Sequence, residues 1–418
     1  MLEKLMELMG SDDSEHQNQA VELFYSLYDE AEIFFSELND MFAHQGTFSI
    51  HTIFKQLGYS ERAIFLVAHV AYLKPELTQD LLELQLSGTL KRTNIHGRMH
   101  PLKKTVPPNI GYLQSLIKLN IAHNHLTHLP ARGEAHLFKL NQLEFLNLQA
   151  NRLSKLPESL SKLKKLTYLN LADNRLRRLP KNLGKLVHLK NLYLTNNRLV
   201  ELPESIVNLV HITRLNLRRN RIEDLPQNIS QNEHLIELDL SFNRIARHVN
   251  QADNQLVQRI ASIPNLQVLN LSQNFLKRLP QGMTQWKQIQ TLILDHNYFS
   301  TFPKKISGLL SLTTLSLEDN NLHRLQTSTI MRLLDRIASI PNLHTLNLSR
   351  NSLFFLSELE CTQFIDILAK MKNLKTLNLR KTDLHEFKDQ ILEKLNHIED
   401  LKIDSRKENH VYFTGQNR

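Results

Sequence analysis

Five arginines recur along the chain at intervals of 23 residues, and each directly follows an asparagine. They are Arg152, Arg175, Arg198, Arg221 and Arg244. An arginine side chain is always charged, and its planar fork of N–H donors matches a carboxylate or a phosphate. If the segments that carry these residues stack as strands, the arginines form a column with a spacing of about 5 Å. The column then has two interpretations: a basic stripe whose repulsion an acidic partner relieves, or a row of solvated side chains at an exposed position.

Aromatic and further charged residues stand beside the leucines of the same segments. They are Phe145, Tyr168 and Tyr193, then Arg214, Arg218 and Arg219, and then Glu237, Asp239 and Phe242. Exposed aromatic and arginine side chains are typical of the residues that dominate protein interfaces. We therefore expect these residues to contribute to a binding surface.

Residues for catalysis or metal binding are not indicated. The sequence lacks the glycine-rich phosphate-binding patterns, the G-x-S-x-G elbow and the H-E-x-x-H motif. We interpret Cys361 as a small structural thiol and not as a nucleophile. No carboxylate or cysteine stands beside His123, His125 and His128 in the sequence. We therefore predict that these histidines lie on the surface and bind no metal. We expect no enzymatic activity, no cofactor and no metal.

The elements that position these residues form a repeat. Twelve units begin at Leu116, Leu143, Leu166, Leu189, Ile212, Leu235, Leu266, Ile289, Leu312, Leu343, Leu374 and Ile398. Most are 23 residues apart and three intervals are 31. In the shared pattern L-x-x-L-x-L-x-x-N-x-L, alternation along a strand points the two leucines of L-x-L to the same side. One such strand cannot form a core alone, so the units must stack in parallel.

An asparagine recurs in register near the end of each predicted strand. The ten residues are Asn124, Asn151, Asn174, Asn197, Asn220, Asn243, Asn274, Asn297, Asn320 and Asn351. An inward amide can bond backbone groups of its own turn and of the adjoining one, and leaving such a buried group unpaired costs about 1–3 kcal/mol. Thr382 takes this position in the eleventh unit, where we expect the ladder of asparagines to fray.

This pattern resembles the leucine-rich repeat over residues 113–404. The 23-residue units are similar to the short intracellular class and the 31-residue units to a longer, helix-bearing class. The resemblance implies a right-handed α/β solenoid, a curved horseshoe with a parallel concave sheet. It also implies non-catalytic protein binding through the concave face, as an intracellular scaffold, adaptor or recognition subunit.

The spacing of the units predicts what covers the other side of the sheet. Units followed by a 23-residue step carry a proline after the repeat leucine, and a proline favours a short extended segment. The three units followed by a 31-residue step lack this proline, and eight extra residues provide about two helical turns. We therefore expect helices in the C-terminal half.

The ends of the chain differ from the array. Residues 1–80 hold 4 Lys and Arg against 14 Asp and Glu, and their apolar spacing predicts a small all-α module. The remaining residues hold 47 against 28. We expect the acidic module to cap the array, to compete with its partner or to bind a separate partner. Residues 81–112 are expected to form an imperfect first repeat or cap, and residues 405–418 a polar tail.

Partner and compartment follow from the same features. A single cysteine, the lack of an apolar N-terminal segment and the lack of an 18-residue apolar run favour a cytoplasmic protein without a membrane span. Signal-independent export as an effector stays open. The predicted partner is another protein with an acidic surface. The alternative is an anionic ligand, a nucleic acid or a phosphoinositide; nucleic acid is less favoured because no recognition motif occurs.

Overall fold

The computed structural model describes residues 67–68, 70–71, 78–86, 92–93, 99–100, 106, 110–129, 136–245, 258–279, 283, 285–299 and 304–404. The chain divides into two compact units, residues 1–212 and 213–418. The predicted all-α module at residues 1–80 lies almost entirely outside the described residues, and the predicted tail at 405–418 lies wholly outside them.

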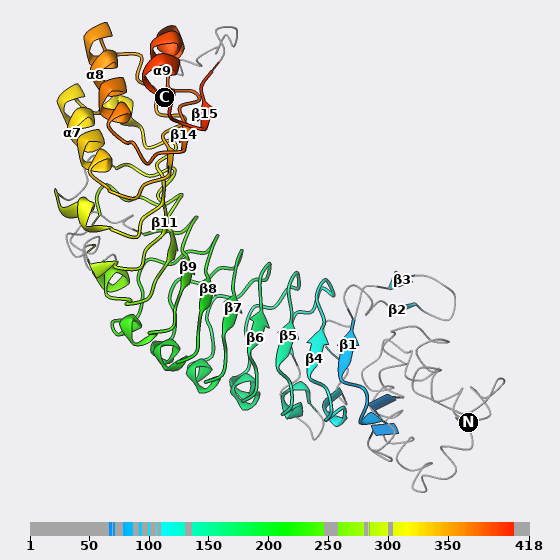
Figure 1. The fold of residues 1–418 in the computed structure, drawn as a ribbon. Helices are drawn as coiled ribbons and strands as arrows, with labels where there is room; N and C mark the ends of the chain where they lie inside the picture. Colours follow the sequence, from blue (N-terminus) through cyan, green and yellow to red (C-terminus); the bar gives the residue numbers. More distant parts are fainter. Residues whose placement is uncertain are drawn as a thin grey trace, which may run out of the picture. The chain divides into compact units, whose positions relative to one another are not determined.

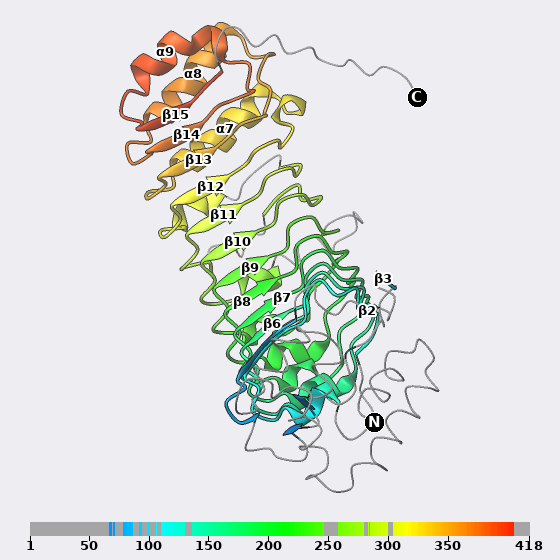
Figure 2. The same ribbon diagram turned by 90° about the vertical axis from the view of Figure 1, so that its right-hand side faces the viewer.

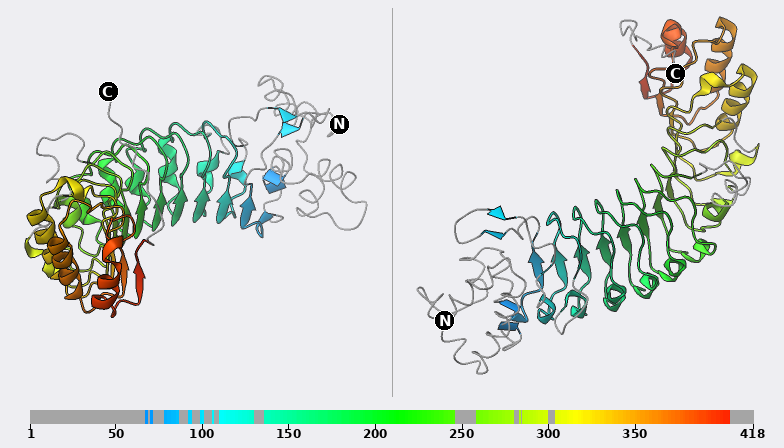
Figure 3. Two further views of the ribbon diagram at one scale, coloured as in Figure 1. Left: turned by 90° about the horizontal axis from the view of Figure 1, so that it is seen from above. Right: turned by 180° about the vertical axis from the view of Figure 1, so that it is seen from behind.

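The first unit is a parallel sheet of three-residue strands (Figure 1). Its order is β1 (Glu83–Gln85), β4 (Lys118–Asn120), β5 (Phe145–Asn147), β6 (Tyr168–Asn170) and β7 (Asn191–Tyr193). A separate antiparallel pair joins β2 (Arg92–Thr93) to β3 (Met99–His100). The connections carry 3-10 turns, namely η2 (Ile110–Tyr112), η3 (Leu137–Lys139), η4 (Glu158–Lys162), η5 (Leu183–Lys185) and η6 (Glu204–Asn208), and η4 to η6 line up in a row opposite the strands (Figure 3).

The second unit continues the same design with longer connections. Its parallel strands are β8 (Arg214–Asn216), β9 (Glu237–Asp239), β10 (Val268–Asn270), β11 (Thr291–Ile293), β12 (Thr314–Ser316), β13 (Thr345–Asn347), β14 (Thr376–Asn378) and β15 (Asp400–Lys402). The 3-10 turns are η7 (Ile229–Gln231), η9 (Lys304–Gly308), η10 (Leu322–Arg324) and η11 (His385–Phe387). The helices α7 (Thr327–Ala338), α8 (Glu358–Ala369) and α9 (Lys388–Lys394) lie next to one another on one face of the last strands (Figure 2).

Equivalent positions of the sequence repeat lie opposite each other in the sheet. From β4 to β15, each strand begins two residues after the predicted start of its unit. Paired residues are the equivalent positions of adjacent units, as in Leu146 opposite Leu169 and Leu169 opposite Leu192. These leucines are fully buried. The predicted α/β solenoid with a parallel sheet is confirmed, and so are the helices in the C-terminal half, which α7 and α8 provide after Gln326 and Ser357.

The ladder asparagines are all buried, with at most 8% of each residue exposed. In the first unit, the Asn174 amide nitrogen donates to the carbonyls of Leu148 at 2.9 Å and Leu171 at 3.1 Å. Its amide oxygen accepts from the backbone N–H of Leu153 at 3.0 Å. Each asparagine thus bonds its own turn and the preceding one, which fastens successive units to each other.

At the eleventh unit the pattern changes. Thr382 is 1% exposed, and its hydroxyl donates to the Leu379 carbonyl of its own turn at 2.7 Å. A hydroxyl has one proton where an amide nitrogen has two. Among the described residues, Thr382 makes no side-chain bond to the preceding unit, which is the bond that Asn351 makes to Leu317 at 2.8 Å.

A left-handed backbone conformation immediately precedes each ladder position. In the first unit it occurs at His123, Ala150, Asp173 and Asn196, with φ between 52° and 59°. None of these residues is a glycine, although a side chain in this region costs about 1–2 kcal/mol. The conformation turns the chain so that the next residue, the ladder asparagine, points inward. The packing of adjacent units therefore holds a strained turn in every repeat.

Truncating an inward leucine should destabilise the array far more than truncating a neighbouring arginine. Leu194 is fully buried and Arg198 is exposed. We expect Leu194→Ala to lower the free energy of unfolding by about 2–5 kcal/mol, because it removes packing against both adjacent units. Arg198→Ala should change it by about 0.5 kcal/mol or less. Urea titrations of the two variants measure this, and equal losses would contradict the assigned directions of the two side chains.

The left-handed conformation of Ala150 allows a separate prediction about stability. We expect Ala150→Val to destabilise the protein by about 1–2 kcal/mol, because a branched side chain fits poorly at a positive φ. Ala150→Gly should stay within about 0.5 kcal/mol of the parent, since relief of the turn is offset by the greater freedom of the unfolded chain. Thermal unfolding of both variants checks the order; a glycine variant as unstable as the valine variant would contradict it.

Candidate functional site

Three aromatic residues of the first unit form one cluster on the outward side of β5, β6 and β7. Phe145 and Tyr168 are register partners, and their rings stack with centroids 4.3 Å apart and planes 11° apart. Tyr193 lies on the next strand in the diagonal position, with its ring centroid 5.4 Å from that of Tyr168. All three are half-buried, because each ring covers part of its neighbour. We call Phe145, Tyr168 and Tyr193 the aromatic patch.

Polar side chains border the aromatic patch beside Tyr168. Burial raises the pKa of Tyr168, the neighbouring Tyr193 adds to this rise, and a hydrogen bond with Asn170 opposes it. The amide of Asn170 also donates to Gln149 at 3.1 Å, and Gln149 donates to the Asp173 carboxylate at 3.0 Å. A fixed polar network therefore borders an amphipathic aromatic surface, as in the centres of protein interfaces.

Three of the column arginines belong to the first unit: Arg152, Arg175 and Arg198. Each is exposed, and each backbone N–H bonds the carbonyl of a repeat leucine in the preceding unit, as from Arg175 to Leu153 at 2.8 Å. Among the described residues, none of the three guanidinium groups forms a hydrogen bond or an ion pair. The column lies on the loops that follow the strands, since β5 already ends at Asn147. These arginines therefore border the strand face that carries the aromatic residues, and a shared binding surface stays a prediction.

The second unit holds the other predicted arginines. The guanidinium carbons of Arg218 and Arg219 lie 4.5 Å and 5.1 Å from the centre of the Phe242 ring. Arg218 also donates to the Ser241 hydroxyl at 3.4 Å. We call Arg218, Arg219 and Phe242 the cation–π cluster. It places two positive charges against one aromatic ring.

Neighbouring positions reduce the expected positive charge. Arg214 forms an ion pair with Glu237 at 2.9 Å, so its charge is already balanced by a residue of the adjacent strand. Arg221 is exposed and Arg244 is half-buried on the loops after β8 and β9. Asp239, on the outward side of β9, accepts from the backbone of Ser241 at 2.9 Å. The predicted basic surface of this unit is therefore mixed in sign.

A second polar group in this unit was not singled out from the sequence. Asp295 accepts from the backbone N–H of Glu318 at 2.9 Å, and His296 bonds Asp319 at 2.9 Å. Burial raises the pKa of Asp295, while hydrogen bonds from Ser316 and Glu318 act against this rise. The signal in the sequence is an acidic or histidine pair directly before the ladder asparagine in two successive units.

The histidines and the cysteine singled out from the sequence differ in burial. His123, His125 and His128 are exposed. The part of the chain that the structure describes holds no group of three or more His, Cys, Asp or Glu residues placed to bind a metal ion. Within the same residues, no helix is both long and apolar enough to cross a membrane. Cys361 is a buried free thiol on α8, and burial raises its pKa to about 11, with further contributions from Glu360 and Glu386.

Comparisons with known proteins agree with the repeat pattern. The family model described as leucine rich repeat matches residues 141–199, 187–245 and 264–322. No curated protein matches the chain by sequence. Among solved structures, a leucine-rich repeat protein of Leptospira interrogans is 28% identical, with a TM-score of 0.55 over 72% of this chain and 75% of that one.

Two further structures share the fold at lower identity. An internalin of Listeria monocytogenes is 20% identical, with a TM-score of 0.50 over 71% of this chain and 84% of that one. A TDR receptor is 21% identical, with a TM-score of 0.51 over 82% of this chain and 58% of that one.

The environment of Cys361 predicts an unreactive thiol. Its pKa of about 11, against the ordinary 9.0, leaves about 100-fold less thiolate at pH 8 than an exposed cysteine has. Alkylation by iodoacetamide should therefore be slow in the native protein and keep rising up to about pH 11, while the rate for the urea-unfolded chain is half-maximal near pH 9 and levels off about one pH unit higher. Since the folded pKa is the higher one, the buried thiol stabilises the fold below pH 9, and this contribution declines as pH rises towards 11. Equal native and unfolded rates at pH 8 would contradict this description.

Proposed function

Because the chain is a leucine-rich repeat protein, we propose that it is a non-catalytic protein-binding module whose partner contacts the aromatic patch. The observation that carries the proposal is the stacking of Phe145 on Tyr168 at 4.3 Å, with Tyr193 alongside, on strands that the repeat core holds rigid. Aromatic side chains that are already ordered lose little conformational freedom on binding, which makes them effective contacts.

The charges beside the patch favour an acidic partner. Arg152, Arg175 and Arg198 are exposed and carry no ion pair within the described residues, so they are available to carboxylates. These arginines occupy equivalent loop positions of successive units, which stack at the strand spacing of about 5 Å, and like charges at this spacing repel each other. An acidic segment along the column would remove this repulsion while an apolar side chain contacts the patch.

The proposed role is that of a scaffold, adaptor or recognition subunit. Leucine-rich repeat folds typically act as interaction scaffolds and not as enzymes. The neutral, buried thiol of Cys361 suits a structural role. The proposed place of action is a reducing, cytoplasmic compartment, because a chain with one cysteine forms no intramolecular disulfide.

A second candidate function rests on the cation–π cluster. Arg218 and Arg219 lie 4.5 Å and 5.1 Å from the centre of one aromatic ring, an arrangement that also suits a phosphate beside a base or a lipid headgroup. Binding through this cluster would depend steeply on salt, because phosphate contacts release counterions. The ion pair of Arg214 with Glu237 counts against an extended phosphate-binding surface.

The aromatic patch can be tested before any partner is identified. We would select peptides from a random displayed library against the full-length protein and measure the affinity of the strongest by calorimetry. Tyr168→Ala combined with Tyr193→Ala should weaken binding by about tenfold or more, because central aromatic contacts dominate interfaces. Arg175→Glu combined with Arg198→Glu should weaken the binding of acidic peptides further at low salt.

A matched control is available in the second unit. Phe275 and Tyr298 are exposed and stacked with ring centroids 6.4 Å apart, but they stand on the loops after β10 and β11. Their alanine substitutions should leave the affinity unchanged. If this control pair weakens binding and the patch variant does not, the aromatic patch is not the binding surface. If a single-stranded oligonucleotide displaces the peptides and Arg218→Ala abolishes that effect, the second candidate function replaces the first.

A further inference from the structure

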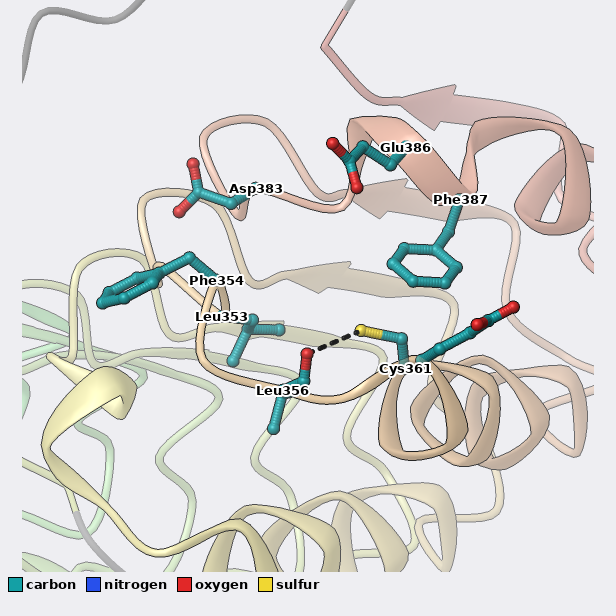
Figure 4. Close-up of a pocket in the computed structure, with 8 residues that line it drawn as sticks. Leu353, Phe354, Leu356, Cys361, Asp383, Glu386 and Phe387 are labelled. Atoms are coloured by element: carbon teal, nitrogen blue, oxygen red, sulfur yellow. Dashed lines mark hydrogen bonds between the residues drawn. The ribbon is translucent and has the colours of Figure 1, made fainter.

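A pocket in the second unit lies between two successive loops that follow the strands. Its volume is about 430 Å³, within the range of about 300–1,000 Å³ that ligand pockets occupy. Leu353, Leu356 and Cys361 form its base, and Phe354 and Phe387 stand at opposite ends of the opening (Figure 4). We call it the Phe354 pocket. It belongs to neither the aromatic patch nor the cation–π cluster.

The base of the pocket is apolar and neutral. Leu353 and Cys361 are each 2% exposed, and Leu356 is 8% exposed. The sulfur of Cys361 lies 3.9 Å from the Leu356 carbonyl oxygen, within reach of a weak hydrogen bond (Figure 4). Because the thiol stays protonated at neutral pH, it presents no charge to the pocket. An apolar side chain could therefore enter without meeting an unpaired charge.

Exposed apolar groups lie at the mouth of the pocket and on the adjoining helix. Phe354 is 72% exposed, although it stands next to the buried Leu353. Phe355 meets its ring edge-on, with centroids 5.9 Å apart. Leu359, at the start of α8, is 69% exposed. Large apolar side chains exposed beside a pocket indicate a contact surface rather than scattered surface residues.

The rim of the pocket is acidic. Glu358, Asp383 and Glu386 line it, and none of the described lining residues carries a positive charge. The Ser352 hydroxyl hydrogen-bonds the Asp383 carboxylate, which sets its position. Glu358 is the first residue of α8, which a capping box between Ser357 and Glu360 fixes. Three carboxylates around a neutral apolar base complement an apolar side chain flanked by positive charges.

From this complementarity we propose that the Phe354 pocket binds a short basic segment of a partner protein. One or two leucine or phenylalanine side chains of the segment fill the space between Phe354 and Phe387. Lysine or arginine residues on either side pair with Glu358, Asp383 and Glu386. The site is separate from the aromatic patch, whose proposed partner is acidic, so the chain would recognise two segments of opposite charge.

The test uses synthetic peptides and the full-length protein. The probe is a fluorescein-labelled ten-residue peptide in which two central leucines are flanked by lysine and arginine, titrated by anisotropy. One comparison peptide replaces the basic residues with glutamate, and another replaces the leucines with serine. The proposal expects binding of the first peptide and little binding of the other two.

Two variants of the pocket separate the apolar and the charged contributions. Phe354→Ser should weaken binding of the basic peptide by about tenfold, as expected for a central aromatic contact. Glu358→Gln combined with Glu386→Gln should weaken it by about three- to tenfold, with a smaller effect at high salt. Asp383 is left unchanged because its carboxylate accepts a hydrogen bond from Ser352.

Matched controls use exposed residues away from the pocket. Leu310→Ser removes another side chain of high exposure, 62%, and Glu393→Gln with Asp335→Asn removes two exposed charges. These controls should bind as the parent does. The proposal is overturned if the controls and the pocket variants lose affinity equally, or if the glutamate peptide binds as tightly as the basic one. It is also overturned if sedimentation shows self-association that Phe354→Ser abolishes, because the occupant would then be a second copy of the chain.

Discussion

Each repeat depends on backbone groups that belong to its neighbour. Asn174 illustrates the dependence, since its side chain bonds Leu148 and Leu153 of the preceding unit as well as Leu171 of its own. A three-residue strand such as β5, with one buried leucine between two half-buried residues, has too little core to be stable alone. The ladder and the stacked leucines together bring equivalent positions of successive units into register. Every other feature of the surface follows from that register.

Because equivalent residues of successive units are in register, each position of the repeat forms a row of side chains on the surface. The positions around the buried leucine carry the aromatic patch in β5 to β7, and the position after the ladder asparagine carries the arginine column. The same position after the ladder is Ser352 in one later unit and Asp383 in the next, where these two residues bond each other at the Phe354 pocket. Because these positions do not support the core, their chemistry can change from unit to unit without altering the fold.

The sequence predicts the parts of the structure that depend on period and polarity. The 23-residue spacing locates each strand two residues after its unit begins, and the loss of proline before the longer intervals predicts α7 and α8. The positive φ at Ala150 or Phe242 has no comparable signal, because residues of many types occupy that position and neighbouring units impose the conformation. The pairing of Arg214 with Glu237, and of Arg218 with Phe242, depends on which way long side chains turn between adjacent units. Composition alone therefore overstates the basic character of this surface.

The Phe354 pocket lies where a longer repeat meets the next unit. A unit that carries the proline has a short 3-10 turn opposite its strand. The unit that contains Leu353 lacks the proline and continues into α8, a helix of 12 residues. The Ser357 capping box fixes the start of that helix, and the next unit supplies Phe387 from η11, so two loops of different build face each other. A space of about 430 Å³ lies between them. A helix-bearing repeat thus places apolar and acidic side chains around one hollow, and the burial of Cys361 keeps the base of that hollow uncharged.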